Sequence, residues 1–93
     1  MTIEEIKSRI MPLLVEYEVR KAAVFGSAAR GESTMESDID LLVEFRGERS
    51  LLDLAGLKLD LEELLHRKVD ILTYDSLHPL LREGILSEQK ALL

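Results

Sequence analysis

The sequence predicts a single α/β domain spanning residues 1–93, in which a small mixed β-sheet of about three strands packs with helices. Short apolar runs alternate with longer stretches in which apolar residues recur at helical spacing. The length of 93 residues is that of one domain. The apolar residues are mainly Leu, Ile, Val and Ala, with only 4% aromatic residues, which favours helices packed on a sheet over a platform for stacking bases.

The first helix is expected to begin after Thr2, because Thr2 and Glu5 have the spacing of a capping box. Apolar residues then follow helical spacing, and the helix should end between residues 17 and 19. Pro12 lies inside this stretch. Because an internal proline removes a backbone hydrogen bond, we expect a kink or a short break there.

Three short apolar runs have the composition of strands and cover residues 21–25, 39–45 and 69–73. Between the first two runs, residues 27–35 are small and polar, which leaves room for a turn and one short helix. Residues 46–49 form a polar turn after the second run.

A long helix is expected to start at Ser50, whose spacing to Asp53 suits a helix start. Its apolar stripe consists of Leu51, Leu54, Leu57, Leu61, Leu64 and Leu65. Residues 75–78 then turn the chain, and Pro79 suits the first turn of a last helix. The apolar residues near one face of that helix are Leu81, Ile85 and Leu92.

This order of elements gathers the polar residues of interest at one edge of the sheet. The long helix joins the second and third strands, so parallel pairing with a right-handed crossover is expected. Asp38 and Asp40 lie at the start of the second strand and Asp70 at the start of the third, so parallel pairing places the three carboxylates together. If the first strand runs antiparallel to the second, Gly26 and Ser27 arrive at the same edge.

Composition and charge exclude several classes of protein. The chain contains no cysteine, which excludes disulfides and cysteine-ligated zinc and makes a cytoplasmic location the default expectation. No apolar run approaches the roughly 20 residues that cross a bilayer, and the acidic N-terminus does not resemble a secretory signal. A net charge of −6 with scattered basic residues argues against direct nucleic-acid binding but suits the binding of divalent cations.

The main chemical signal is Asp38-Ile39-Asp40. Residues two apart on a strand face the same side, so the two carboxylates should project together. Adjacent carboxylates repel each other unless a positive charge lies between them, and Mg²⁺ prefers carboxylate oxygens together with substrate phosphates. Asp70 lies between apolar residues, where an unpartnered charge is costly. The alternatives are a chance Asp-x-Asp on a solvated strand end and a turn capped by Asp70.

The turn Gly26-Ser27 after the first strand is a candidate phosphate-binding loop. A glycine lets a phosphate approach the backbone, and a helix that begins there offers free N–H groups. The Ser27 hydroxyl could donate to a phosphate oxygen, and Arg30 could reach the phosphates or brace the loop. A Gly-Ser pair is also common in ordinary turns, and the chain contains no Walker A motif.

Together these residues resemble a known family. Gly26-Ser27, followed after ten residues by Asp38-Ile39-Asp40, matches the G-S-x10-D-x-D signature of the DNA polymerase β-like nucleotidyltransferase superfamily. The longer string GSAARGESTMESDIDLLVEF is similar to its minimal branch, the MNT domain proteins. The resemblance covers nearly the whole chain, including residues 69–72 and 81–93, and implies the polymerase β-like fold.

The resemblance also implies roles for individual residues. Gly26 and Ser27 would contact the phosphates of a nucleoside triphosphate. Asp38 and Asp40 would ligate Mg²⁺, and Asp70 would help to place the metal and accept the proton of the attacking hydroxyl. The implied reaction is a two-metal, in-line displacement in which a hydroxyl attacks the α-phosphate of ATP and pyrophosphate leaves.

Members of this branch are commonly antitoxins of prokaryotic toxin–antitoxin pairs, with a HEPN ribonuclease toxin as partner. The resemblance therefore implies transfer of AMP from ATP to a tyrosine hydroxyl of the toxin. The alternatives are a catalytically silent module that neutralises its partner by binding, transfer to a small molecule, and a purely structural domain. The preferred base, the number of monophosphates transferred and the oligomeric state do not follow from the sequence.

Three other residues have simpler interpretations. His66 and His78 lie on separate segments without ligand spacing, which favours surface or capping roles over zinc binding. Tyr74 is expected either in the core or near a nucleotide base.

Overall fold

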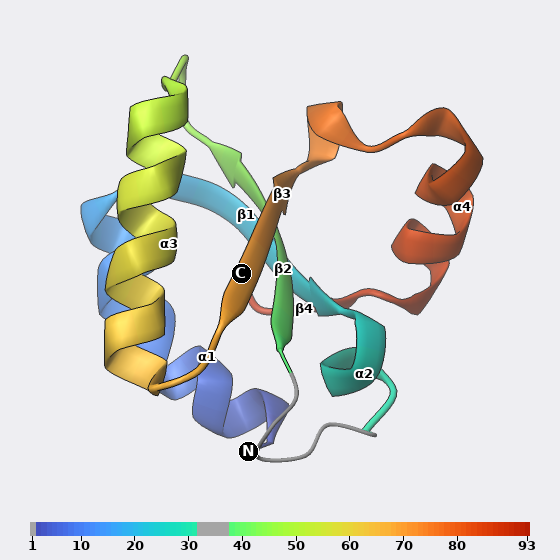
Figure 1. Cartoon of the computed structure of the whole chain (residues 1–93), viewed down its shortest axis with the longest axis horizontal. Coiled ribbons are helices and arrows are strands. Elements are labelled where there is room, and N and C mark those ends of the chain that lie inside the picture. The colour runs from blue at the N-terminus through green and yellow to red at the C-terminus, as the bar shows by residue number, and fades with distance from the viewer. Residues whose placement is uncertain (1, 32–37) are drawn as a thin grey trace.

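The computed structural model describes residues 2–31 and 38–93. Within these residues, a sheet in the order β3-β2-β1-β4 forms the middle layer (Figure 1). The strands are β1 (Val19–Phe25), β2 (Ile39–Phe45), β3 (Val69–Thr73) and β4 (Lys90–Ala91). The helices are α1 (Ile3–Glu16), α2 (Gly26–Ala29), α3 (Leu51–Leu65) and α4 (Pro79–Glu88), with a 3₁₀ turn, η1 (Tyr74–Ser76), before α4. Helices α1 and α3 lie on one side of the sheet and α4 on the other (Figure 1).

The pairing of the strands confirms the predicted topology. Strand β2 runs parallel to β3, with Asp40 opposite Asp70, and antiparallel to β1, with Phe25 opposite Asp40. The long helix α3 supplies the crossover between the parallel strands. The end of β1 therefore meets the starts of β2 and β3 at one edge of the sheet.

The main core lies between the sheet and helices α1 and α3. Ile39, Leu41 and Val43 alternate along β2 and are fully buried in it. Because successive side chains of a strand point to opposite faces, Asp40 and Leu42 extend from the other face. That face carries a smaller cluster under α4, made of Leu42, Tyr74 and Leu77 with Phe25, Ile85 and Leu86 packed against them. Helix α4 itself has no fully buried residue.

The predicted helix starts are confirmed. The Thr2 hydroxyl accepts a hydrogen bond from the Glu5 N–H at 3.1 Å, and Ser50 and Asp53 form a complete capping box. Pro79 occupies the first turn of α4, as expected. Helix α2 begins at Gly26, at the start of the segment expected to hold a turn and a short helix, while residues 32–35 of that segment lie outside the described residues.

Three expectations about helices differ from the structure. Of the kink or short break expected at Pro12, the break does not occur: helix α1 is continuous, because the turns on either side are anchored by buried side chains while Pro12 itself faces solvent. Leu51 and Leu64 are exposed, since the leucine stripe of α3 is wider than the face that contacts the core. The last helix ends at Glu88, so Leu92 is not on it but follows the two-residue strand β4 and is buried in the main core.

None of the helices in the described part of the chain is long and apolar enough to cross a membrane.

Candidate active site

Three aspartates approach one another at the edge where β2 and β3 begin. Asp40 and Asp70 are direct partners in the parallel register, and neighbouring strands lie roughly 4.8 Å apart. Burial raises the pKa of Asp40, and the negative charges of Asp70 and Asp38 raise it further, whereas Arg30 lowers it. These effects show that Asp38 and Asp70 both lie within electrostatic reach of Asp40.

The Gly26 turn lies directly against Asp40. Gly26 follows the last residue of β1 and has a φ of +69°, in the left-handed region that favours glycine. A Cβ atom at this position would collide with the Asp40 carboxylate. The close approach explains why the chain has glycine here and brings the backbone of the predicted phosphate-binding turn to the carboxylates. Ser27 follows in the first turn of α2 and is half-buried.

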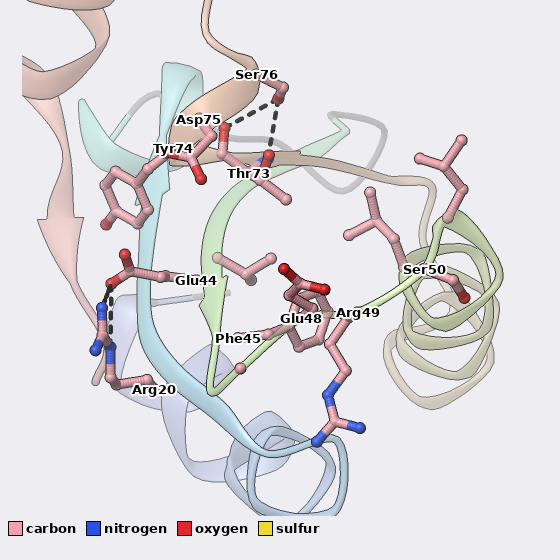
Figure 2. Close-up of a pocket in the computed structure, with 14 residues that line it drawn as sticks. Arg20, Glu44, Phe45, Glu48, Arg49, Ser50, Thr73, Tyr74, Asp75 and Ser76 are labelled. Atoms are coloured by element: carbon pink, nitrogen blue, oxygen red, sulfur yellow. Dashed lines mark hydrogen bonds and ion pairs between the residues drawn. The ribbon is translucent and has the colours of Figure 1, made fainter.

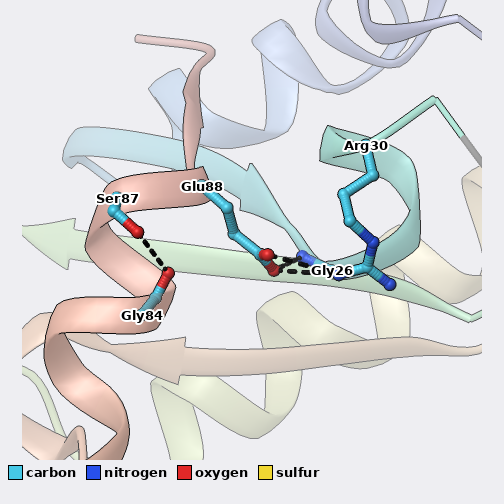
Figure 3. A network of polar contacts seen from close by, with 5 residues as sticks. All are labelled: Gly26, Arg30, Gly84, Ser87 and Glu88. Atoms are coloured by element: carbon cyan, nitrogen blue, oxygen red, sulfur yellow. Dashed lines mark hydrogen bonds and ion pairs between the residues drawn. The ribbon is translucent and has the colours of Figure 1, made fainter.

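The sequence analysis missed Glu88, the last residue of α4 (Figure 3). Its Oε1 accepts a hydrogen bond from the Gly26 N–H at 2.9 Å. The Arg30 guanidinium also donates to Glu88, at 3.2 Å to Oε1 and 3.3 Å to Oε2. The contact joins residues 62 positions apart, and a glutamate at the end of a helix gives no local sequence signal of such a contact. Arg30 therefore braces the turn through Glu88.

The donor set of the three aspartates fits Mg²⁺ in chemical terms. Asp38, Asp40 and Asp70 offer only hard carboxylate oxygens, and the pKa of Asp40 is raised first by burial and then by the neighbouring negative charges, which a cation would offset. Across the described residues, no group of three or more acidic or histidine side chains lies close enough together to hold a metal ion. The strand pairing thus places the residues Asp40 and Asp70 next to each other, while the three carboxylate groups are not gathered around a common point.

A cavity of about 670 Å³ lies elsewhere, at the opposite ends of β2 and β3 (Figure 2). Its polar lining includes Arg20 and Glu44, which form an ion pair at 2.8 Å. Tyr74 also lines it, and its hydroxyl donates to Gln89 at 2.9 Å while its ring packs in the smaller core cluster. Tyr74 is thus a core residue at the far end of β3 from Asp70, which does not support a role beside a nucleotide base.

The two histidines have the structural roles expected for them. His66 is the exposed residue that ends α3 in a left-handed conformation. His78 caps α4, and its Nδ1 accepts a hydrogen bond from the Leu80 N–H at 3.1 Å.

Comparison with known proteins identifies the family of the chain. Residues 3–92 match the family described as the nucleotidyltransferase domain. The chain belongs to the nucleotidyltransferase family. The match includes the Gly26 turn and all three aspartates, and it agrees with the resemblance that the sequence motif predicted.

Two relatives of this nucleotidyltransferase carry more specific names. It is 54% identical over 88 residues to the provisionally named protein adenylyltransferase MJ0435 of Methanocaldococcus jannaschii, covering 95% of both chains. It is 38% identical over 92 residues to the protein adenylyltransferase MntA of Thermococcus cleftensis, covering 95% of this chain and 93% of that protein. Both matches extend over nearly the whole of each protein.

The fold also matches a solved structure of a tri-AMPylated Shewanella oneidensis HEPN toxin in complex with an MNT antitoxin. The TM-score is 0.76, at 20% sequence identity, and the match covers 99% of this nucleotidyltransferase and 72% of the other chain. At this identity the likeness concerns the fold.

Proposed function

We propose that this nucleotidyltransferase transfers AMP from ATP to a tyrosine hydroxyl of a partner HEPN toxin and so acts as an antitoxin. The observation that carries the proposal is the adjacency of Asp40 and Asp70 on one sheet face, with the Gly26 turn against Asp40. The names of the relatives support a protein as the acceptor.

Each residue of the site has a role in this proposal. Asp38, Asp40 and Asp70 would hold Mg²⁺, which when bound would neutralise charge on the phosphates. The Gly26 N–H and the Ser27 hydroxyl would donate to phosphate oxygens of ATP. The tyrosine oxygen attacks the α-phosphorus, the bond to the bridging oxygen of the β-phosphate breaks, and pyrophosphate leaves. Asp70 would accept the tyrosine proton.

Exposed leucines on β3 and α4 suit an acceptor carried by a protein. Leu72 extends from the same face of β3 as Asp70, two residues along, and is 37% exposed. On α4, Leu80 and Leu81 are 87% and 60% exposed. Large exposed apolar side chains are a feature of protein-binding surfaces. This supports the C-terminal helix as part of the partner surface.

Transfer of label tests the proposed activity. The purified chain is incubated with Mg²⁺, a HEPN protein from the same organism as the proposed partner, and ATP labelled at either the α- or the γ-phosphate. The proposal predicts covalent label on the HEPN protein from α-labelled ATP only. A HEPN protein with its acceptor tyrosine changed to phenylalanine serves as the control. Label from γ-labelled ATP would instead indicate a kinase, and no label from either would contradict the transfer.

One observation favours a second candidate, a catalytically silent module that neutralises its partner by binding. The Gly26 N–H, a donor that the phosphates would need, already donates to the Glu88 carboxylate. If this arrangement is permanent, the chain would form a stable complex with the HEPN protein and inhibit it equally well with and without ATP. Inhibition that requires ATP, and persists after the two proteins are separated, would exclude this candidate.

A further inference from the structure

The Glu88 carboxylate lies at the turn where the proposed function places the phosphates of ATP (Figure 3). It accepts the Gly26 N–H at 2.9 Å and pairs with the Arg30 guanidinium at 3.2 Å. A backbone N–H donor and a guanidinium are also the groups that bind phosphate oxygens in proteins. The carboxylate oxygens of Glu88 therefore accept hydrogen bonds from donors of the kind that bind a triphosphate.

Two anions cannot both accept from the Gly26 N–H at once. The Gly26 N–H has one hydrogen, which already points at Glu88 Oε1. A phosphate oxygen brought to the same donor would meet the Glu88 carboxylate at close range, where like charges repel. The Asp40 carboxylate also lies close to Gly26, where a Cβ atom would collide with it.

The position of Glu88 allows it to leave. Glu88 is the last residue of α4, a helix without a fully buried residue, and its side chain is 34% exposed. After it, Gln89 is extended and the chain continues into β4. The carboxylate can rotate into solvent without unpacking the core, because its contacts with the turn are polar and partly exposed.

We propose that Glu88 is a built-in competitor of the triphosphate, which holds the Gly26 turn and Arg30 closed until a nucleotide displaces it. The inference rests on the proposed function, because it takes a nucleoside triphosphate as the ligand of this turn. In this proposal Glu88 lowers the affinity of the site for ATP. Removing its charge should strengthen nucleotide binding.

Titration calorimetry with variants tests the inference. The probe is α,β-methylene-ATP with Mg²⁺, which the transfer reaction cannot cleave, and the variants are Glu88→Gln and Glu88→Ala. Glu83→Gln is the matched control, because Glu83 is an exposed glutamate of the same helix and its loss changes the net charge equally. We expect the Kd to fall roughly tenfold in both Glu88 variants, the order expected for freeing charge-assisted donors, and to stay near the wild-type value in Glu83→Gln.

Fragments of the nucleotide locate the effect. Pyrophosphate with Mg²⁺ should bind the Glu88 variants more tightly than the wild type, as the analogue does. Adenosine should bind the wild type and all the variants with the same Kd. A thermal melt of each variant confirms that it is folded. If the Glu88 variants bound adenosine more tightly than the wild type but not pyrophosphate, the inference would be overturned, because the effect would then concern the nucleoside and not the phosphates.

The outcomes separate the inference from the proposed function. If the wild-type chain binds the analogue and the Glu88 variants bind it no more tightly, Glu88 is not a competitor and the proposed function stands. Weaker binding by folded Glu88 variants would also overturn the inference, since Glu88 would then support the bound state. If neither wild-type nor variants bind the analogue or pyrophosphate, the proposed function fails and the inference fails with it.

Discussion

Asp40 of β2 and Asp70 of β3 are direct neighbours across a parallel strand pair, on the sheet face opposite the main core. The parallel register and the period of two along each strand place the two residues side by side on this face. A cation bound between them would relieve the repulsion of neighbouring carboxylates.

Replacing Asp40 by asparagine should stabilise the fold at neutral pH. Because burial and neighbouring charges raise the pKa of Asp40 above 3.8, its ionised form is less favourable in the folded than in the unfolded chain. The cost is absent below the unfolded pKa and grows as the pH rises through the folded pKa. We expect Asp40→Asn to gain less than about 1 kcal/mol of unfolding free energy at pH 7, since the half-exposed carboxylate is partly screened.

Urea unfolding at pH 7 and at about pH 3 measures this gain, which should vanish at the lower pH. Asp75→Asn is the control, because Asp75 is an exposed aspartate outside the site. A loss of stability in Asp40→Asn at pH 7 would show that the ionised Asp40 has a stabilising partner.

Magnesium should stabilise the wild-type chain. A ligand that binds only the folded state adds RT ln(1 + [L]/Kd), about 2.7 kcal/mol at a concentration of 100 Kd. We expect the melting temperature to rise with Mg²⁺ in the wild type and to stay nearly constant in Asp40→Asn and Asp70→Asn. Sodium chloride at matched ionic strength controls for screening. An equal rise of the melting temperature in all three proteins would show that Mg²⁺ binds away from Asp40 and Asp70.

Alanine at Gly26 should disturb the site as well as the backbone. Gly26 and Gly47 both have a φ near +70°, but a Cβ at Gly47 meets nothing within 4 Å, whereas at Gly26 it collides with Asp40. Both alanine variants should lose about 1 kcal/mol from backbone strain. Gly26→Ala should in addition displace the half-exposed Asp40 carboxylate, and it should therefore lower the transfer rate more than Gly47→Ala does. Equal transfer rates for the two variants would contradict the close approach.

Tyr17 should ionise at unusually high pH. Its hydroxyl donates to Asp60 at 2.6 Å, and this hydrogen bond, with burial and the charge of Asp60, raises the pKa of Tyr17 to about 12. The stability from this contact is fully present below the ordinary pKa of 10.0 and is lost as the pH rises through about 12. Ultraviolet titration in a Tyr74→Phe background isolates Tyr17. Asp60→Asn should return its pKa toward 10.0, and an unchanged value would assign the shift to another cause.

The parts of the fold that were predictable are those with a repeating pattern or a local chemical signal. Two strands, Ile39–Phe45 and Val69–Thr73, have the predicted bounds, because each is a short β-rich run with polar residues on both sides. Parallel pairing then followed from the helix between them, and it brought Asp40 beside Asp70.

The parts that were missed depend on contacts between distant residues. Strand β4 has two residues, too few for any periodicity, and exists because it pairs with β1. The bond from Gly26 to Glu88 likewise spans 62 positions and arises only once α4 is folded back over the sheet. Pro12 stays inside α1 because tertiary burial of its neighbours outweighs one lost hydrogen bond.

Label transfer by aspartate variants tests the central claim, that Asp40 and Asp70 together form the catalytic site. The assay measures covalent AMP on the HEPN protein from α-labelled ATP with Mg²⁺, using Asp40→Asn, Asp70→Asn and the control Asp75→Asn, all shown to be folded. The account predicts that both site variants lose at least about 100-fold in rate while the control keeps the wild-type rate. Wild-type transfer by either site variant would contradict it.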